Sequence, residues 1–292
     1  RELSSSATEF WMRTMSPADA SLRCRVSSGK FVPMSRSSPP LYTAMWPFST
    51  TLTPWPPSES SSRAACWTVS GSCLFRVGQS VDVIPASRDF SHCKLVLVPN
   101  LIVTDPDFAA RLKAYVARGG VAVVTYRTAV KDRDNNLVFG KTIPVDCGDL
   151  LGLYVEETES VQAYDCIPLA GEKGSGTAGI FRDMVVPQGA QVLWRYDDPF
   201  YRSYAAITRN AYGQGAAYYL GTTPDQATLD QVLGQAMEEV GLQRLDLPEG
   251  VESVLRGEGD SQVRILLNHN EVPVHALGQE LAPFQVKVLP VT

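Results

Sequence analysis

Three short apolar runs in the middle of the chain have the length and composition of β-strands. They occupy residues 81–84, 94–98 and 121–126, and the third run is apolar on both faces. A strand with one face in water would alternate between apolar and polar residues. The third run therefore predicts an interior strand of a parallel sheet that is covered by helices.

The segment between the second and third runs predicts a helix. Residues 104–107, Thr-Asp-Pro-Asp, supply an N-cap, an early proline and an acidic first turn. Apolar side chains then recur at helical spacing and form one face, which consists of Phe108, Leu112, Tyr115 and Val116. Gly119–Gly120 predicts the end of the helix in a left-handed cap. The order strand, helix, strand predicts a right-handed βαβ unit.

The following hundred residues are less regular. A polar turn at residues 131–136 leads into a stretch without clear period, and residues 205–208 and 216–220 then predict two strands joined through a Gly-Gln-Gly turn. Thr223–Pro224 predicts the start of a second helix, with Gln226 in the capping-box position. Its apolar face ends before Gly241 and consists of Leu229, Val232, Leu233, Ala236, Met237 and Val240.

After a linker at residues 245–249 the pattern changes to strands alone. Residues 251–255, 263–269 and 284–289 are strand-like, with no helix between them. They predict a small antiparallel β domain at residues 249–292, next to an α/β domain at residues 76–244.

Residues 1–75 form an anomalous segment rich in Ser, Pro and Trp. They contain 17 serines, 8 of the 20 prolines and 4 of the 5 tryptophans, but no Ile, Asn, Gln or His. Disordered linkers are rich in Ser and Pro but poor in aromatic residues, so neither a linker nor a globular domain explains this composition. We interpret most of residues 7–74 as frameshifted or misannotated translation.

The codons of residues 44–48 support this interpretation. Stepping them back by one base yields Val-Ala and two further apolar residues, and the threonines that follow yield polar residues. This is the pattern of a buried parallel strand that ends in a polar loop. On this interpretation, residues 1–74 pack poorly and the sheet lacks a strand beside residues 94–98.

Charge and composition exclude several classes of partner. A net charge of −5 and a pI near 5.3 provide no basic surface for nucleic acid or an anionic membrane. No run approaches the roughly 18 apolar residues of a membrane span, and no signal peptide is evident, so we expect a cytoplasmic protein. The cysteines and histidines lack zinc-ligand spacing, so we expect no metal and no cofactor; they are Cys24, Cys66, Cys73, Cys93, Cys147, Cys166, His92, His269 and His275.

The acidic pairs of the chain are poor candidates for glycosidase chemistry. Glu156–Glu157, Asp197–Asp198 and Glu238–Glu239 are each adjacent in sequence, and adjacent side chains point apart on a helix or strand. A retaining glycosidase needs two carboxylates about 5 to 5.5 Å apart. We therefore expect surface charge at all three pairs and assign no catalytic residue.

Two further motifs were weighed against enzyme function. An enzyme of amidotransferase type needs a nucleophilic cysteine at a strand-to-helix elbow, but the matching place, residues 125–128, has none, and no strand leads into Cys147. The glycines of residues 171–179 lack the Gly-Lys-Ser/Thr ending of a phosphate loop. A flexible loop is expected there.

Five segments in order resemble the C-terminal half of family 42 glycoside hydrolases, which are β-galactosidases. Residues 117–127 with 132–135, and residues 149–157, resemble the family's trimerisation domain. Residues 204–210 and 212–221 resemble the closing hairpin of that domain, and residues 266–270 resemble the core strand of the family's C-terminal domain. Arg202-Ser-Tyr204 departs from the Gly-Lys-Pro-like step usual in the family. This departure puts only the local loop in doubt.

The resemblance implies a flavodoxin-like fold, related in shape to class I glutamine amidotransferases, and a parent enzyme that releases terminal β-galactose. Both catalytic glutamates would lie on a (β/α)₈ barrel, so the galactoside substrate would be bound only through that barrel. This chain would be the non-catalytic part and would hold a homotrimer together. The alternatives are a stand-alone amidotransferase-like enzyme and an assembly module that binds a carbohydrate or another small molecule.

Overall fold

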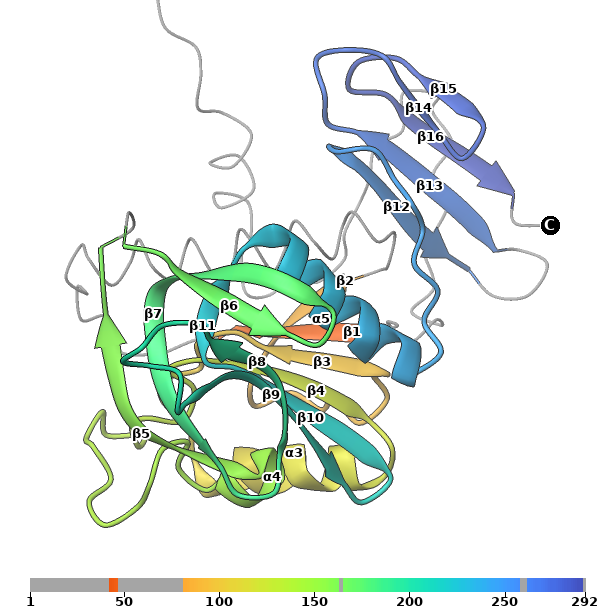
Figure 1. Cartoon of the computed structure of the whole chain (residues 1–292). Coiled ribbons are helices and arrows are strands. Elements are labelled where there is room, and N and C mark those ends of the chain that lie inside the picture. Colours follow the sequence, from red (N-terminus) through yellow and green to blue (C-terminus); the bar gives the residue numbers. More distant parts are fainter. Residues whose placement is uncertain (1–41, 47–80, 163–164, 258–261, 291–292) are drawn as a thin grey trace, which may run out of the picture. The chain divides into compact units, whose positions relative to one another are not determined.

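The computed structural model describes residues 42–46, 81–162, 165–257 and 262–290, and every structural statement below concerns these ranges. One half of the main sheet consists of parallel strands in the spatial order β2-β1-β3-β4-β10 (Figure 1). The strands are β1 (Tyr42–Trp46), β2 (Val81–Pro85), β3 (Leu95–Val98), β4 (Val121–Thr125) and β10 (Gly215–Leu220).

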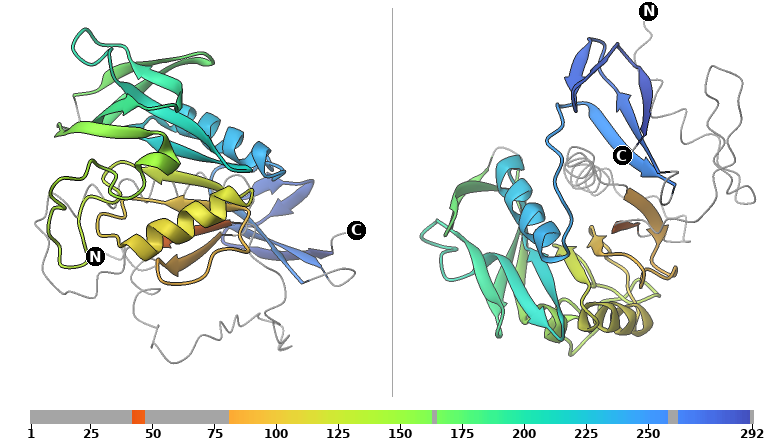
Figure 2. Two further views of the ribbon diagram at one scale, coloured as in Figure 1. Left: turned by 90° about the horizontal axis from the view of Figure 1, so that it is seen from below. Right: turned by 90° about the vertical axis from the view of Figure 1, so that its right-hand side faces the viewer.

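Helices cover both faces of the parallel half, as the sequence predicts. Alternate residues of β3 point to opposite sides, because successive side chains of a strand do so. Val96 and Val98 pack with the buried face of α3 (Pro106–Ala117), and Leu95 and Leu97 pack with that of α5 (Gln226–Glu239). Figure 2 shows the two helices on opposite sides of the sheet. The predicted α/β architecture is confirmed.

Both long helices begin with an aspartate cap. Asp105 accepts a hydrogen bond from the Phe108 amide at 2.7 Å, within the predicted segment. The second helix begins later than predicted, because Asp225 caps it through the Thr228 amide at 2.9 Å. Residues 222–224 instead form strand β11 (Thr222–Pro224), whose pairing with β7 outweighs the local helix signal.

The stretch predicted to be irregular forms the antiparallel half of the same sheet, and this prediction is wrong. The order continues from β10 as β9-β8-β6-β7-β11, and β5 pairs with β7. Glycines and half-buried alternation hid these strands from the periodicity. They are β5 (Leu153–Ser160), β6 (Ile167–Gly171), β7 (Gly174–Pro187), β8 (Gln191–Tyr196) and β9 (Ala205–Tyr212).

The C-terminal residues form a separate antiparallel sheet, in agreement with the prediction. It has the order β12-β13-β16, formed by β12 (Val251–Arg256), β13 (Val263–Asn268) and β16 (Val286–Pro290). The sequence did not predict a second hairpin, β14 (Val274–Ala276) and β15 (Gln279–Leu281). Leu266, in the segment that resembles the family's core strand, is fully buried with Ala276 and Leu281.

The prediction that the sheet lacks a strand beside residues 94–98 is wrong. β1 pairs in parallel with β3 on one side and with β2 on the other, so Tyr42–Trp46 takes an interior place in the sheet. The rest of residues 1–74 lies outside the described residues.

Candidate functional site at the carboxyl edge of the parallel sheet

The carboxyl ends of β3, β4 and β10 are the place where an open α/β sheet would bind a ligand. Three residues other than glycine have positive φ at the first two of these ends, namely Asn100 (48°), Arg127 (58°) and Ala129 (56°). Such backbone is strained and persists only where neighbours hold it. Asn100 is held by its amide, which donates to the Thr125 Oγ1 at 2.8 Å, and by its Nδ2, which donates to the Tyr126 carbonyl at 3.0 Å.

Arg127 occupies the elbow directly after β4, where an amidotransferase-type enzyme would place its nucleophile. The structure thus has the backbone shape of an elbow without a reactive side chain. The Arg127 guanidinium lies 5.2 Å from the ring centre of Phe181, and that ring stacks on Tyr126 at 5.0 Å. Side chains of β7 therefore fill the space above the elbow.

A buried carboxylate ties the two halves of the sheet together at this edge. Asp183 on β7 is 0% exposed and accepts hydrogen bonds from Tyr219 Oη at 2.5 Å and Thr158 Oγ1 at 2.7 Å. The Asp183 amide donates to the Gly221 carbonyl at 2.7 Å. Burial raises the pKa of Asp183 to about 6, against the lowering effect of the hydrogen bonds from Tyr219, Thr158 and the Arg127 backbone.

The neighbouring charge, Arg182, is also buried and is engaged by its surroundings. Its guanidinium forms an ion pair with Asp165 at 3.3 Å and lies 5.2 Å from the ring centre of Tyr201. Sequence reasoning missed both Arg182 and Asp183. The signal was present, because two adjacent charged residues interrupt the apolar run of residues 180–186.

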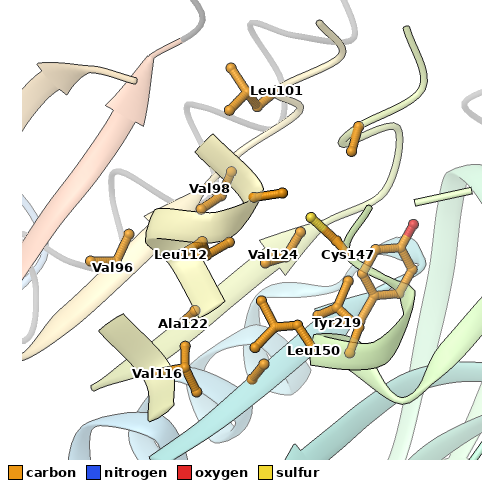
Figure 3. Close-up of a cluster of buried hydrophobic side chains, with 14 of the residues drawn as sticks. Val96, Val98, Leu101, Leu112, Val116, Ala122, Val124, Cys147, Leu150 and Tyr219 are labelled. Atoms are coloured by element: carbon orange, nitrogen blue, oxygen red, sulfur yellow. The ribbon is translucent and has the colours of Figure 1, made fainter. Parts of the chain in front are cut away.

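Cys147 lies directly before the short helix α4 (Gly148–Leu151), away from any strand end. It is 2% exposed, and Figure 3 shows it among apolar side chains that include Val124, Leu150 and Tyr219. Burial raises the pKa of the Cys147 thiol to about 12. The thiolate is the reactive form of cysteine, so this residue is a poor nucleophile.

The three acidic pairs are placed as surface charge, with one exception. Glu156 and Glu157 are exposed on β5, and Asp198 caps its own turn by accepting from the Phe200 amide at 2.8 Å. Glu239 differs, because Arg209 binds it through two hydrogen bonds of 2.6 and 2.9 Å and the Tyr218 hydroxyl donates to it. Glu239 therefore has a structural partner that sequence reasoning did not foresee.

The glycines of residues 171–179 do not form a flexible loop, so that prediction is wrong. Gly171 pairs with Gly174 across a turn of two residues, and the stretch belongs to the hairpin of β6 and β7. Gly176 is required for packing, since a Cβ there would lie 2.1 Å from the Thr228 Oγ1.

No group of three or more His, Cys, Asp or Glu residues able to hold a metal ion occurs in the described ranges. None of the helices within those ranges has the length and hydropathy needed to cross a bilayer.

Comparison with known proteins identifies the α/β domain. A family model described as the β-galactosidase trimerisation domain matches residues 72–243. A β-galactosidase from Clostridium cellulovorans is 31% identical over 202 residues, which cover 68% of this chain and 30% of that protein. One from Planococcus sp. strain L4 is 27% identical over 204 residues, with shares of 68% and 30%. The chain thus spans about 30% of the length of these curated relatives.

Solved structures share the fold. The crystal structure of a β-galactosidase from Bacillus circulans sp. alkalophilus has a TM-score of 0.78 at 22% identity and covers 86% of this chain and 41% of its own. That of a β-galactosidase from Rahnella sp. R3 has a TM-score of 0.75 at 24% identity, with shares of 86% and 40%.

Fold and site define an α/β protein whose sheet edge is closed by its own side chains. The chain belongs to the β-galactosidase trimerisation domain family, and what it matches is the non-catalytic domain of family 42 β-galactosidases.

Proposed function

We propose that this chain is the non-catalytic assembly part of a β-galactosidase that hydrolyses terminal non-reducing β-D-galactosyl residues. The observation that carries the proposal is the closed carboxyl edge of the parallel sheet. Phe181 and Asp183 fill the place where an α/β enzyme binds its substrate, and Arg127 stands where a nucleophile would be. The galactoside would be bound only by a catalytic barrel supplied elsewhere in the parent protein.

The proposal includes a flavodoxin-like fold for the parallel half. Numbered along the chain, the five parallel strands have the spatial order 2-1-3-4-5, which is the flavodoxin order. The antiparallel half is inserted between the fourth and fifth of these strands, since β5 to β9 follow β4 and precede β10. A domain of this shape supports an assembly role, because its rigid core can present fixed surfaces to neighbouring subunits.

The proposed assembly is a homotrimer in the cytoplasm. Family membership supports the trimer, since the family is described as a trimerisation domain. The cytoplasmic location and the absence of nucleic-acid and membrane partners stay predictions from composition and charge.

Two measurements on the purified chain test the proposal. Light scattering should give a molar mass about three times that of the 31.8 kDa chain. A chromogenic β-galactoside should not be cleaved, since a retaining glycosidase needs a carboxylate pair about 5 to 5.5 Å apart. Turnover that survives removal of host β-galactosidase would refute the non-catalytic role, and a monomer at all concentrations would refute the assembly role.

We also propose that the composition break near residue 75 marks a change of reading frame within residues 7–74. The missing residue types and the four tryptophans support it, whereas the interior place of β1 weighs against a complete loss of meaning. Sequencing the gene and recovering a peptide across Trp46 by mass spectrometry test the proposal. One uninterrupted frame with that peptide present would refute it.

A further inference from the structure

The loop between β4 and α4 exposes two large apolar side chains. Phe139 is 95% exposed, more than any other large hydrophobic residue in the described ranges, and Leu137 is 56% exposed. Figure 1 shows this loop projecting from the body of the α/β domain. An isolated exposed leucine needs no explanation, but a fully exposed phenylalanine beside it forms an apolar tip that water solvates poorly.

Hydrogen bonds fix the base of the loop. The amides of Val130 and Lys131 donate to the Ile102 carbonyl at 2.9 and 3.0 Å, and the Thr104 amide donates back to the Lys131 carbonyl at 3.0 Å. Isolated β-bridges join Lys131 to Val103 and to Leu137. The loop thus continues the sheet.

A turn inside the loop is fixed in the same way. The Asp132 carboxylate accepts from the amides of Asp134 and Asn136 at 3.0 and 2.8 Å, and the Asp132 amide donates to the Asn136 carbonyl at 3.0 Å. Arg133 donates two hydrogen bonds to Asp105, the cap of α3, at 3.0 and 2.8 Å. The tip is therefore ordered in advance, so binding through it costs little conformational entropy.

We infer that Leu137 and Phe139 form an anchor that binds an apolar surface on a second copy of this chain. The inference rests on the proposed assembly role. Interfaces derive most of their affinity from a few aromatic or aliphatic anchors surrounded by polar residues, and charged residues of both signs, Lys131 to Asp134, precede this anchor. The mixed signs also favour a protein partner over an anionic lipid surface, which would select basic residues alone.

A second copy fits the symmetry of the family. A ring of three subunits uses heterologous contacts, in which a projecting surface on one subunit meets a different, receiving surface on the next. The Leu137–Phe139 anchor has the projecting shape. Each subunit then contributes one anchor and one receiving surface, and the ring closes without a free anchor.

The test compares the full chain with three variants by sedimentation velocity across a range of concentrations. Phe139→Ala should weaken self-association by about tenfold or more at each contact, which is the scale of loss for an interface anchor. Phe139→Leu should retain most of the association. Phe200→Ala is the matched control, because Phe200 is also an exposed aromatic residue, at 69%, and should leave association unchanged.

Two further readings keep the result interpretable. Thermal unfolding at a concentration where the chain is dissociated should be the same for Phe139→Ala and wild type, since the side chain has no contacts to lose in the single chain. Hydrogen exchange at residues 137–141 should slow when wild type associates. An oligomer that forms equally well with Phe139→Ala would overturn the anchor alone, whereas a wild-type chain that stays monomeric would overturn the assembly role and the anchor with it.

Discussion

The parallel and antiparallel halves of the main sheet are held in different ways. β3 and β4 are buried along their whole length, and almost every side chain they present to α3 and α5 is apolar. β7, in the antiparallel half, carries the buried charges Arg182 and Asp183, each with specific polar partners. The comparison teaches that burial of apolar area stabilises the first half, whereas directed hydrogen bonds fix how the second half joins it.

The largest effect should come from a cavity in the parallel half. Leu112 on α3 is almost fully buried against β3 and β4 (Figure 3). Leu112→Ala should lower the free energy of unfolding by about 3 kcal/mol, the usual scale for a buried leucine, measured by urea denaturation. Val83→Thr on β2 is a control at a half-exposed site and should cost about 0.5 kcal/mol or less. Equal losses for the two variants would contradict the claim that apolar burial holds this half.

A buried carboxylate gives the antiparallel half its own pH dependence. The pKa of Asp183 is about 6 in the folded chain and 3.8 in its ordinary state, so the folded state holds the proton more tightly between these values. Stability should therefore fall by about 3 kcal/mol as the pH rises from about 4 to 6. Asp183→Asn should remove that fall, as measured by urea denaturation at a series of pH values.

The cavity variant serves as the control for this pH effect. Leu112→Ala should lower stability at every pH while keeping the shape of the wild-type profile, because Leu112 carries no titratable group. If Asp183→Asn keeps the wild-type fall between pH 4 and 6, Asp183 is not the group responsible.

The same contrast explains how much of the fold the sequence could predict. Strand β4 and the face of α3 with Leu112 and Val116 were predicted because long apolar runs and helical spacing are properties of the local sequence. β7 was not predicted, because its residues contact β5, β6, β9 and β11, and only the folded sheet brings these together. The start of α5 was misplaced for the same reason, since pairing of Thr222 with Arg182 overrides a local helix signal.

The candidate site was less predictable than the fold. Nothing in the spacing of Arg127, Asp183 and Tyr219 indicates that they meet, since they come from separate strand ends and their contacts span up to 56 residues of β7 and β4 only in three dimensions. The absence of a cysteine at residues 125–128 was predictable. The positive φ of Arg127, which preserves the elbow, required the structure.

The smallest effect should come from the surface contact between the halves. Arg209 on β9 binds Glu239 at the end of α5 through two hydrogen bonds, and both side chains are about a quarter exposed. Solvent screening limits such a pair, so Arg209→Ala should cost about 1 kcal/mol at neutral pH, and added salt should reduce that cost. Arg209→Lys should recover only part of it, because lysine cannot form the paired hydrogen bonds.

The pH dependence of this contact should have the opposite sign to that of Asp183. Burial raises the pKa of Glu239, but the hydrogen bonds from Arg209 and Tyr218 outweigh it and hold the pKa below the ordinary 4.5. A carboxylate with a lowered pKa contributes stability above 4.5 and loses it as the pH falls through the folded value. The cost of Arg209→Ala should therefore be present at pH 7 and shrink below pH 4.5, as measured by urea denaturation at both pH values. A cost that grows on acidification would show that Arg209 acts through packing of its side chain and not through the charge of Glu239.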